Sequence, residues 1–354
     1  MLNNTDPAEN GSDVVRQAKA PSIAIVGATG AVGVELLRCI EARGMATSRV
    51  RLLASARSAG RTMAFNGEML TVETLDEHSF DGIDIALFSA GSGISKRYAD
   101  IAVKAGAIVV DNSSAFRMDA AVPLVVPEVN PGALAAHAGV IANPNCVAAI
   151  ATIALAPLHR EQAIRRLTIA TYQAASGAGA AAMEELREST AAYLRGEAYE
   201  PRVLPHPYAF NLFSHNAEMD AESGHNGEEL KVVAETRKIL GTPDLNIGIT
   251  CIRVPVLRTH AMAISVEFDA PMAPERARAL LATAPGLRIV DDLERNHYPM
   301  PSEATGQDDV LVGRIRRDLG DPTGRTLALF VVGDQLLKGA ALNAVQIAER
   351  LIQR

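Results

Sequence analysis

SIAIVGATGAVGVELLRCI, residues 22–40, runs from a β-branched segment through three glycines into a helical pattern. Glycines at this spacing permit a tight strand-to-helix turn and let backbone amides approach a pyrophosphate, whose charge is favoured at a helix N-terminus. The stretch predicts a dinucleotide-binding turn, with a glycine-rich turn that binds nothing as the alternative. The predicted cofactor contacts in this turn are Gly27, Thr29, Gly30, Ala31, Val32 and Gly33.

The segments around and after this turn alternate short β-branched runs with amphipathic helical patterns. The candidate strands are Ile23–Val26, Val50–Ala54, Ile83–Ser89, Val109–Asp111 and Val140–Ala142. This alternation is typical of a parallel, doubly wound α/β sheet of the Rossmann type. A chain of 354 residues is long enough for two domains. We expect the nucleotide-binding domain at residues 21–145, completed by a C-terminal helix at 334–354.

Longer candidate strands that alternate more plainly follow Cys146. They are Leu167–Tyr172, Ala261–Phe268, Val310–Arg317 and Leu327–Val332. Alternation of this kind predicts an α+β domain at residues 146–333, with a mixed or antiparallel sheet that is covered on one face. We expect a helix at Gly227–Leu240, a loop-rich excursion at Pro201–Gly227 and a closing helix at Asp334–Ile352.

Composition narrows the class of protein. The net charge of −7, with no cluster of Lys and Arg, argues against nucleic acid as a partner. Three cysteines in so long a chain fit thiols in a reducing, cytoplasmic compartment. Residues 1–20 lack the apolar run of a secretory signal and are predicted to be a disordered tail. No apolar stretch is long enough to span a membrane, and we expect no metal.

The end of the second candidate strand indicates which dinucleotide would bind. An NAD site usually has Asp or Glu there, to hold the ribose hydroxyls. The segment Ala54–Arg61 has no acid and instead contains the possible donors Ser55, Arg57 and Ser58. Guanidinium and hydroxyl groups suit a 2′-phosphate, so the prediction is NADP. Arg57 or Arg61 could also be an ordinary solvated charge.

The strongest candidate for a nucleophile is Cys146. It follows Asn143-Pro144-Asn145 and precedes an Ala-rich helical run, which places it at a helix N-terminus with Asn145 as a possible N-cap. Unpaired amides and the helix dipole stabilise a thiolate at that position. Buried cysteine is commonly a small hydrophobe, and we assign Cys39 and Cys251 to the core on that ground.

The chain from residue 22 onward resembles the aspartate-semialdehyde dehydrogenase family. The segments that carry the resemblance are GATGAVG (27–33), SARSAG (55–60), DNSSAFR (111–117), VPEVN (126–130), NPNC (143–146), YQAASGAG (172–179), EELK (228–231), CIRVPVLRTH (251–260) and KGAALNAVQIAE (338–349). Two features depart from the family's pattern: the tail before residue 22, and Phe213-Ser214-His215, where a proline is usual at the middle position.

The resemblance implies a covalent mechanism. A cysteine thiolate attacks aspartyl phosphate, phosphate leaves, and NADPH reduces the thioester to L-aspartate 4-semialdehyde, the aldehyde from which lysine (through diaminopimelate), threonine, methionine and isoleucine are made. Cys146 matches the nucleophile, His260 the general acid/base, and Gln173 the residue that orients the acyl group and can donate to an oxyanion. A thioester accepts hydride more readily than a carboxylate does.

The resemblance also assigns the groups that bind substrate and cofactor. Arg253 matches the residue that binds the α-carboxylate, and Glu228 matches the residue that binds the amino group. Read without the family, Arg253 could be an exposed ion pair, and Glu228 with Lys231 a surface pair on one helix face. The predicted phosphate ligands are Arg117, Lys231 and Asn145, and the predicted cofactor contacts near the nicotinamide are Ser176, Gly177 and Gln335.

Members of this family are usually homodimers or homotetramers in which the second domain supplies the interface, and the same is expected here. Two other functions stay open. One is a related acyl-phosphate reductase, such as one acting on N-acetylglutamyl phosphate, whose substrate has no free amino group for Glu228. The other is a catalytically idle homologue that binds nucleotide or a partner, which would have little reason to keep Cys146, Gln173, Arg253 and His260 together.

Overall fold

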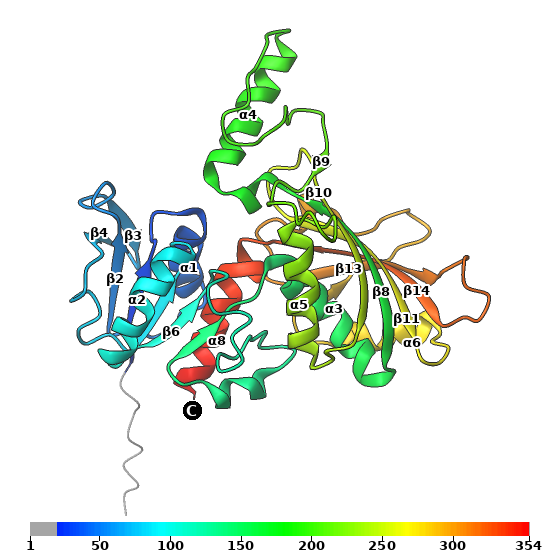
Figure 1. The fold of residues 1–354 in the computed structure, drawn as a ribbon, viewed down its shortest axis with the longest axis horizontal. Helices are drawn as coiled ribbons and strands as arrows, with labels where there is room; N and C mark the ends of the chain where they lie inside the picture. The colour runs from blue at the N-terminus through cyan, green and yellow to red at the C-terminus, as the bar shows by residue number, and fades with distance from the viewer. Residues whose placement is uncertain (1–19, 354) are drawn as a thin grey trace, which may run out of the picture.

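The computed structural model describes residues 20–353, so the tail predicted for residues 1–20 lies outside the described residues apart from its last residue. The described chain forms two lobes, each built on a seven-stranded sheet, with an arm that projects from the second lobe (Figure 1). The two-domain α/β architecture predicted from the sequence is confirmed. Within residues 20–353 there is no helix with the length and apolar character needed to cross a membrane.

The first sheet has the order β3-β4-β2-β1-β5-β6-β7, and every neighbouring pair is parallel except β3 with β4. Its strands are β1 (Ser22–Val26), β2 (Arg49–Ala54), β3 (Thr62–Phe65), β4 (Glu68–Thr74), β5 (Ile85–Phe88), β6 (Ile108–Asp111) and β7 (Val140–Ala142). Helices α1 (Ala31–Ala42) and α2 (Ser92–Lys104) follow β1 and β5. The chain reverses its direction of winding at β1, and the carboxyl end of such a strand is where α/β sheets bind ligands.

The second sheet has the order β12-β13-β14-β11-β8-β10-β9 and is mixed. Its strands are β8 (Ile164–Gln173), β9 (Phe213–Ser214), β10 (Asn246–Arg253), β11 (His260–Phe268), β12 (Leu287–Ile289), β13 (Val310–Arg317) and β14 (Thr326–Gly333). Strand β10 runs parallel to β8, and β12 runs parallel to β13, so a purely antiparallel sheet is excluded. A parallel pair needs a long crossover, which here is the arm together with α5 (Gly227–Leu240).

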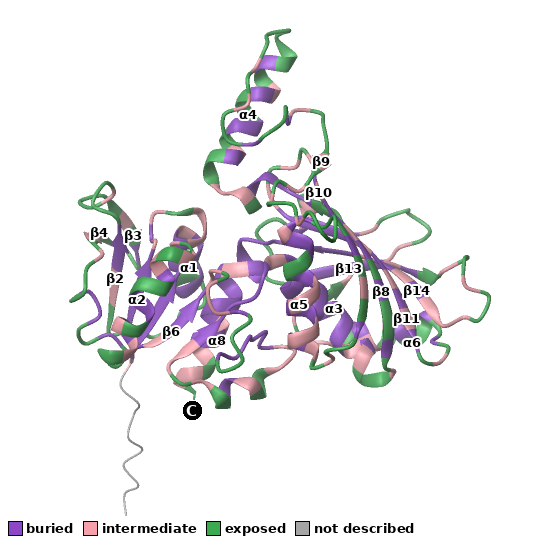
Figure 2. Cartoon of the chain, in the orientation of Figure 1, coloured by how far each residue is buried: buried purple, intermediate pink, exposed green. Residues whose placement is uncertain are grey.

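Helices cover one face of this second sheet. The helices α3 (Cys146–Glu161), α5 and α6 (Pro274–Ala282) pack on it around one apolar core, while residues on the other face of β8 are exposed or half-buried (Figure 2). The predicted single covered face is therefore confirmed. The helix predicted at Gly227–Leu240 has the observed bounds, because Asn226 forms a capping box at its start and Gly241 adopts a left-handed conformation at its end.

The chain returns to the first lobe at its C-terminus. Helix α8 (Leu342–Ile352) packs against α1 and β6, and Leu342, Val345 and Ile347 share a core with β1. The predicted closing helix at Asp334–Ile352 begins later than expected as an α-helix, because a π-helical turn, η3 (Leu337–Ala341), precedes α8.

The arm consists of α4 (Ala180–Leu194) and the segment that leads through β9 to α5 (Figure 1). The predicted excursion at Pro201–Gly227 contains only the short strand β9 and is otherwise irregular. A small apolar cluster that includes Leu186, Leu204 and Tyr208 holds the arm together. The remaining short helices are η1 (Pro131–Ala136), η2 (Ala175–Ala178) and α7 (Pro301–Ala304).

Candidate active site

A cavity of about 250 Å³ lies where the two lobes meet and contains most of the predicted site residues. Residues from the start of α1, from β8 and β10, and from the chain before η3 all contribute to its wall. The predicted residues that line it are Val32, Arg117, Asn145, Cys146, Gln173, Ser176, Gly177, Glu228, Arg253, His260 and Gln335. The fold thus gathers side chains that are more than two hundred residues apart in the sequence.

Cys146 is the first residue of α3, as predicted. The side chain of Asn145 caps this helix by accepting hydrogen bonds from the amides of Val147 at 2.9 Å and Ala148 at 3.3 Å. Burial nevertheless raises the pKa of the Cys146 thiol to about 12, and the negative charge of Glu228 adds to this effect. The helix N-terminus was expected to stabilise a thiolate, but the effect of desolvation on the pKa of Cys146 is larger.

The π-helical turn η3 packs against Cys146 through Gly339. A Cβ atom added to Gly339 would lie 2.7 Å from the Cβ of Cys146, which is too close for two carbon atoms. Only glycine therefore allows this turn to pack on the start of α3. Turns of this type occur often at functional sites.

His260 is completely buried, and its two ring nitrogens have different environments. The amide of Ala174 donates a hydrogen bond to Nδ1 at 3.0 Å, whereas the buried Nε2 has no partner within the described structure. Because an amide N–H can only donate, the neutral ring must carry its proton on Nε2. Burial and the nearby charge of Arg253 lower the pKa of His260 well below its usual value, which favours this neutral form.

The backbone before His260 is held in an uncommon conformation. Thr259 has a φ of 85°, and its amide donates a hydrogen bond to Oε1 of Gln335 at 2.8 Å. The amide nitrogen of Gln335 donates to the hydroxyl of Ser176. Gln335, itself a predicted cofactor contact, therefore links Ser176, another predicted cofactor contact, to the segment that positions His260. Strained backbone of the kind seen at Thr259 is common at active sites.

Opposite charges face the cavity near Cys146. Oε1 of Glu228 accepts hydrogen bonds from Asn145 at 2.9 Å and from Gln173 at 3.1 Å. The buried guanidinium of Arg253 donates to Oδ1 of Asn216 at 3.1 Å and to the carbonyl of Ala174 at 3.0 Å. A buried anion and a buried cation in one small cavity suit a ligand that carries both charges.

The three predicted phosphate ligands are placed differently. Arg117 lines the cavity and is anchored through Glu235 at 3.1 Å and the carbonyls of Asn143 and Asn112 at 2.9 and 2.7 Å. One N–H on each terminal nitrogen remains available for a ligand. Lys231 is exposed on α5 and does not line the cavity, although its charge acts on the neighbouring His215. The structure thus brings Arg117 and Asn145 to the cavity and leaves Lys231 outside it.

A second cavity, of about 400 Å³, lies at the carboxyl end of β1 and β2. Gly27 has a φ of 85°, and a Cβ at Gly33 would lie 2.2 Å from the carbonyl oxygen of Gly27, so both positions require glycine. The start of α1 lies between the two cavities, because Gly30 lines this one and Val32 the other. The predicted residues that line the second cavity are Gly27, Thr29, Gly30, Ser55, Arg57 and Ser58.

The structure adds residues that the sequence analysis had not assigned to the site. His215 lines the cavity of Cys146 and lies 2.7 Å from Arg253. The only sequence signal was its place in the segment that departs from the family pattern. Glu235, which anchors Arg117, gave no signal, because its role depends on the packing of α5 against α3.

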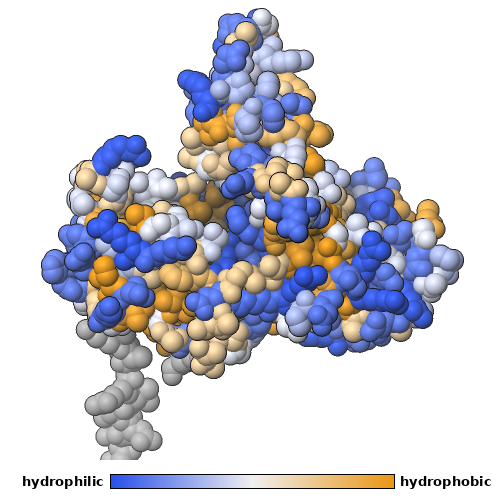
Figure 3. Space-filling model, in the orientation of Figure 1, coloured by the Kyte–Doolittle hydropathy of each residue, from blue (hydrophilic) through white to orange (hydrophobic). Residues whose placement is uncertain are grey.

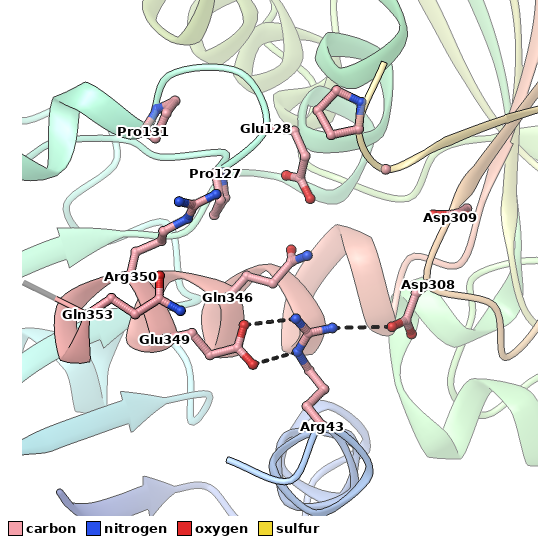
Figure 4. A pocket seen from close by; sticks show the side chains of 12 residues that line it. Arg43, Pro127, Glu128, Pro131, Asp308, Asp309, Gln346, Glu349, Arg350 and Gln353 are labelled. Carbon is pink, nitrogen blue, oxygen red and sulfur yellow. Dashed lines mark hydrogen bonds and ion pairs between the residues drawn. The ribbon is translucent and has the colours of Figure 1, made fainter. Parts of the chain in front are cut away.

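A further cavity, of about 650 Å³, forms a polar seam between the lobes (Figure 4). Arg43 pairs with Glu349 of the same lobe through two hydrogen bonds of 2.7 and 2.8 Å, and it lies 3.5 Å from Asp308 of the second lobe across the seam. None of the predicted site residues lines this cavity. We place the site in the smaller cavity because that one holds the cysteine together with His260.

The fold and this site define a class, that of two-domain nucleotide-binding oxidoreductases that act on the aldehyde group. Residues 22–137 match the family model "Semialdehyde dehydrogenase, NAD binding domain", and residues 155–338 match "Semialdehyde dehydrogenase, dimerisation domain". The chain belongs to the aspartate-semialdehyde dehydrogenase family.

Individual relatives agree with this assignment. The chain is 52% identical to the aspartate-semialdehyde dehydrogenase of Synechocystis sp., over 94% of this chain and 97% of that protein. It is 45% identical to the one from Bacillus subtilis, over 93% and 96%. The crystal structure of aspartate semialdehyde dehydrogenase II from Vibrio cholerae, complexed with ASA, superposes with a TM-score of 0.91 at 40% identity, covering 95% of this chain and 99% of that one.

Proposed function

We propose that the protein reduces L-aspartyl 4-phosphate to L-aspartate 4-semialdehyde, with release of phosphate, through a thioacyl intermediate on Cys146. The observation that carries the proposal is the shared cavity in which this cysteine faces Arg253, Glu228 and His260. Membership of the aspartate-semialdehyde dehydrogenase family supports the same reaction.

The charges in the cavity support an α-amino acid derivative as substrate. Arg253 would bind the α-carboxylate and Glu228 the ammonium group, so that each buried charge gains a partner of opposite sign. Arg117 would bind the phosphate, with Asn145 nearby and with Lys231 reaching in from the rim. An N-acetylated substrate has no ammonium group for Glu228, which would then remain a buried unpaired carboxylate, so the geometry favours the free amino acid.

The reaction starts and ends with the Cys146 thiolate, so the proton of the thiol is lost only once, to solvent. The thiolate of Cys146 attacks the acyl carbon, the bond from that carbon to the phosphate oxygen breaks, and phosphate leaves with the electron pair. NADPH, when bound, supplies the hydride that reduces the thioester. Gln173 and the Nε2–H of His260 donate hydrogen bonds to the oxygen as negative charge develops on it. Collapse of this oxyanion breaks the carbon–sulfur bond and releases the aldehyde and the thiolate.

The proton on Nε2 defines what His260 can do without rearrangement. As a neutral Nε2–H group, His260 donates a hydrogen bond to the thiolate or to the oxyanion. To accept the proton of Cys146, it would first have to move its own proton to Nδ1 and lose the bond from the Ala174 amide. We therefore propose that the main role of His260 is to donate a hydrogen bond from Nε2, and that its general acid/base role is secondary.

We further propose NADP rather than NAD as the cofactor. The second cavity fits a dinucleotide because the glycine turn opens it at the N-terminus of α1. Arg57 is exposed there and forms no ion pair with any of residues 20–353, and Ser55 and Ser58 line the same cavity, which supports binding of a 2′-phosphate. Ser176, Gly177 and Gln335 in the other cavity would contact the nicotinamide end.

The assembly is proposed to be a homodimer or a homotetramer in the cytoplasm. The family model names the second lobe a dimerisation domain, and the uncovered face of its sheet exposes Tyr172. The arm adds exposed apolar side chains at Tyr193, Leu194, Phe210 and Leu212, and apolar patches are visible on it in Figure 3.

We keep the domain boundaries at residues 21–145 and 146–333, with the terminal helix assigned to the first domain.

The test is NADPH formation from L-aspartate 4-semialdehyde, NADP and phosphate, with each omitted in turn and with NAD in place of NADP. We expect turnover that requires phosphate and prefers NADP. Turnover of N-acetylglutamate semialdehyde in preference would move the assignment to that reductase. A folded, reduced protein that turns over neither compound, and whose Cys146 does not react with iodoacetamide, would contradict the proposal.

A further inference from the structure

His215, which follows β9, holds the guanidinium of Arg253 from the arm side of the cavity. The Nη2 of Arg253 lies 2.7 Å from the Nε2 of His215. A guanidinium has no lone pair to offer, so Nε2 must act as the acceptor in this contact. Nothing in the proposed mechanism uses His215, although its ring lies in the cavity wall beside Arg253.

The other nitrogen of this ring also receives a hydrogen bond. The amide of Ala217 donates to Nδ1 of His215 at 3.2 Å, and an amide N–H cannot accept. A neutral imidazole has one N–H and one lone pair, so it cannot accept at both nitrogens. Burial and the charge of Arg253 lower the pKa of His215 to about 4, so the ring is neutral at pH 7. The ring can therefore satisfy only one of these two contacts at a time.

A carboxylate at Arg253 removes this conflict. The Nη2 of Arg253 can then donate to the carboxylate, and the ring, once it has moved away from Nη2, can carry its proton on Nε2, where the same carboxylate accepts it. Nδ1 keeps its lone pair for the Ala217 amide, so every donor finds an acceptor. An uncharged group at this place would accept weaker hydrogen bonds from Arg253 and His215 than a carboxylate does.

We propose that His215 is a second carboxylate-binding residue, which acts with Arg253 to select substrates that carry a carboxylate at this end. The proposal rests on the proposed function, since that assigns Arg253 to the α-carboxylate. The competing role is that of a brace, in which His215 only accepts from Arg253 and never contacts substrate.

Kinetic discrimination separates the two roles. L-Aspartate 4-semialdehyde and 3-aminopropanal have the same aldehyde and amino groups, but only the first has a carboxylate. In His215→Ala we expect kcat/KM for the semialdehyde to fall roughly 10- to 100-fold, mainly through KM, because a hydrogen bond to a charged group is lost. With 3-aminopropanal we expect little change. His215→Gln, whose amide can donate near the place of Nε2, should recover much of the loss.

Equal losses with both aldehydes, or no loss with either, would overturn the proposal in favour of a brace.

A second readout does not depend on turnover. In ¹⁵N spectra of the wild-type protein, L-2-aminobutyrate should move the His215 proton to Nε2, whereas propylamine, which lacks the carboxylate, should not; His215→Gln identifies the signal. An unchanged ring with L-2-aminobutyrate bound would also overturn the proposal. Absence of wild-type turnover of the semialdehyde would count against the proposed function alone.

Discussion

At the scale of single residues, Cys146 presents a problem of protonation. Its half-buried side chain lines the same cavity as Glu228, and desolvation and the charge of that carboxylate both oppose ionisation. An ammonium group bound to Glu228 would neutralise that charge, so the substrate itself would help to form the thiolate. Reactivity and recognition would thus be coupled through one carboxylate, which acts on the thiol and would bind the amino group of the substrate.

Replacing the nucleophile should separate binding from chemistry. Cys146→Ser is expected to lower kcat by roughly two orders of magnitude or more while NADPH binding stays intact, because a hydroxyl is a far weaker nucleophile. Turnover and NADPH fluorescence titration measure the two effects. Cys39→Ser, in the core of α1, is the control and should keep its kcat. Retention of more than a few per cent of the rate in Cys146→Ser would contradict a covalent mechanism.

His260 should behave as a donor that stays neutral. His260→Ala is expected to lower kcat roughly 100- to 1,000-fold, and His260→Gln, which keeps a donor near Nε2, only about tenfold. Because the pKa of His260 is lowered well below its usual value, the ring is neutral throughout the range from pH 6 to pH 8. The wild-type kcat should therefore not fall as pH rises over that range. A loss of activity over that range that is absent from His260→Gln would instead identify the imidazolium as the working form.

At the scale of elements, the turn η3 and helix α3 depend on each other. Gly339→Ala should force η3 away from Cys146, destabilising the fold by about 1–3 kcal/mol and lowering kcat. Thermal unfolding and turnover are the measurements. Gly132→Ala in η1 is the matched control, since a Cβ there meets nothing within 4 Å and the change should be neutral or slightly stabilising. Equal behaviour of the two variants would show that the packing of η3 is not critical.

At the scale of the whole molecule, Arg258 ties the lobes together beside the active site. It bonds Glu35 of α1 at 2.7 Å and the buried Asp334 at 2.7 Å. Arg258→Ala leaves Asp334 without its cation and should cost on the order of 3 kcal/mol in the free energy of unfolding. Arg38→Ala removes a weaker, exposed partner of the same Glu35 and should cost less than about 1 kcal/mol. Denaturant unfolding compares them, and equal costs would refute the buried clamp.

Local patterns were sufficient where the structure depends on neighbouring residues. The alternation of β-branched runs and helices predicted five of the seven strands of the first sheet, because each βα unit follows from its own periodicity and turn, whereas β3 and β4 were not predicted. Asn66 and Gly67, both with positive φ, form the turn between β3 and β4 that the sequence analysis did not predict, although an Asn-Gly pair is a strong hairpin signal. The capping of α3 by Asn145 and of α5 by Asn226 was equally local.

Tertiary structure decided what depends on distant segments. The parallel pairing of β8 with β10 requires the whole arm as a crossover, and the π-helical turn at Gly339 arises where the chain passes Cys146, so neither has a periodic signal. The proton on Nε2 of His260 follows from an amide 86 residues away, and the conflict at His215 from an arginine 38 residues away. The sequence by itself determined which chemical groups are present and which local elements carry them. Only the fold decided which groups share a buried space, and therefore their protonation, because desolvation and hydrogen bonding act through distance in space and not along the chain.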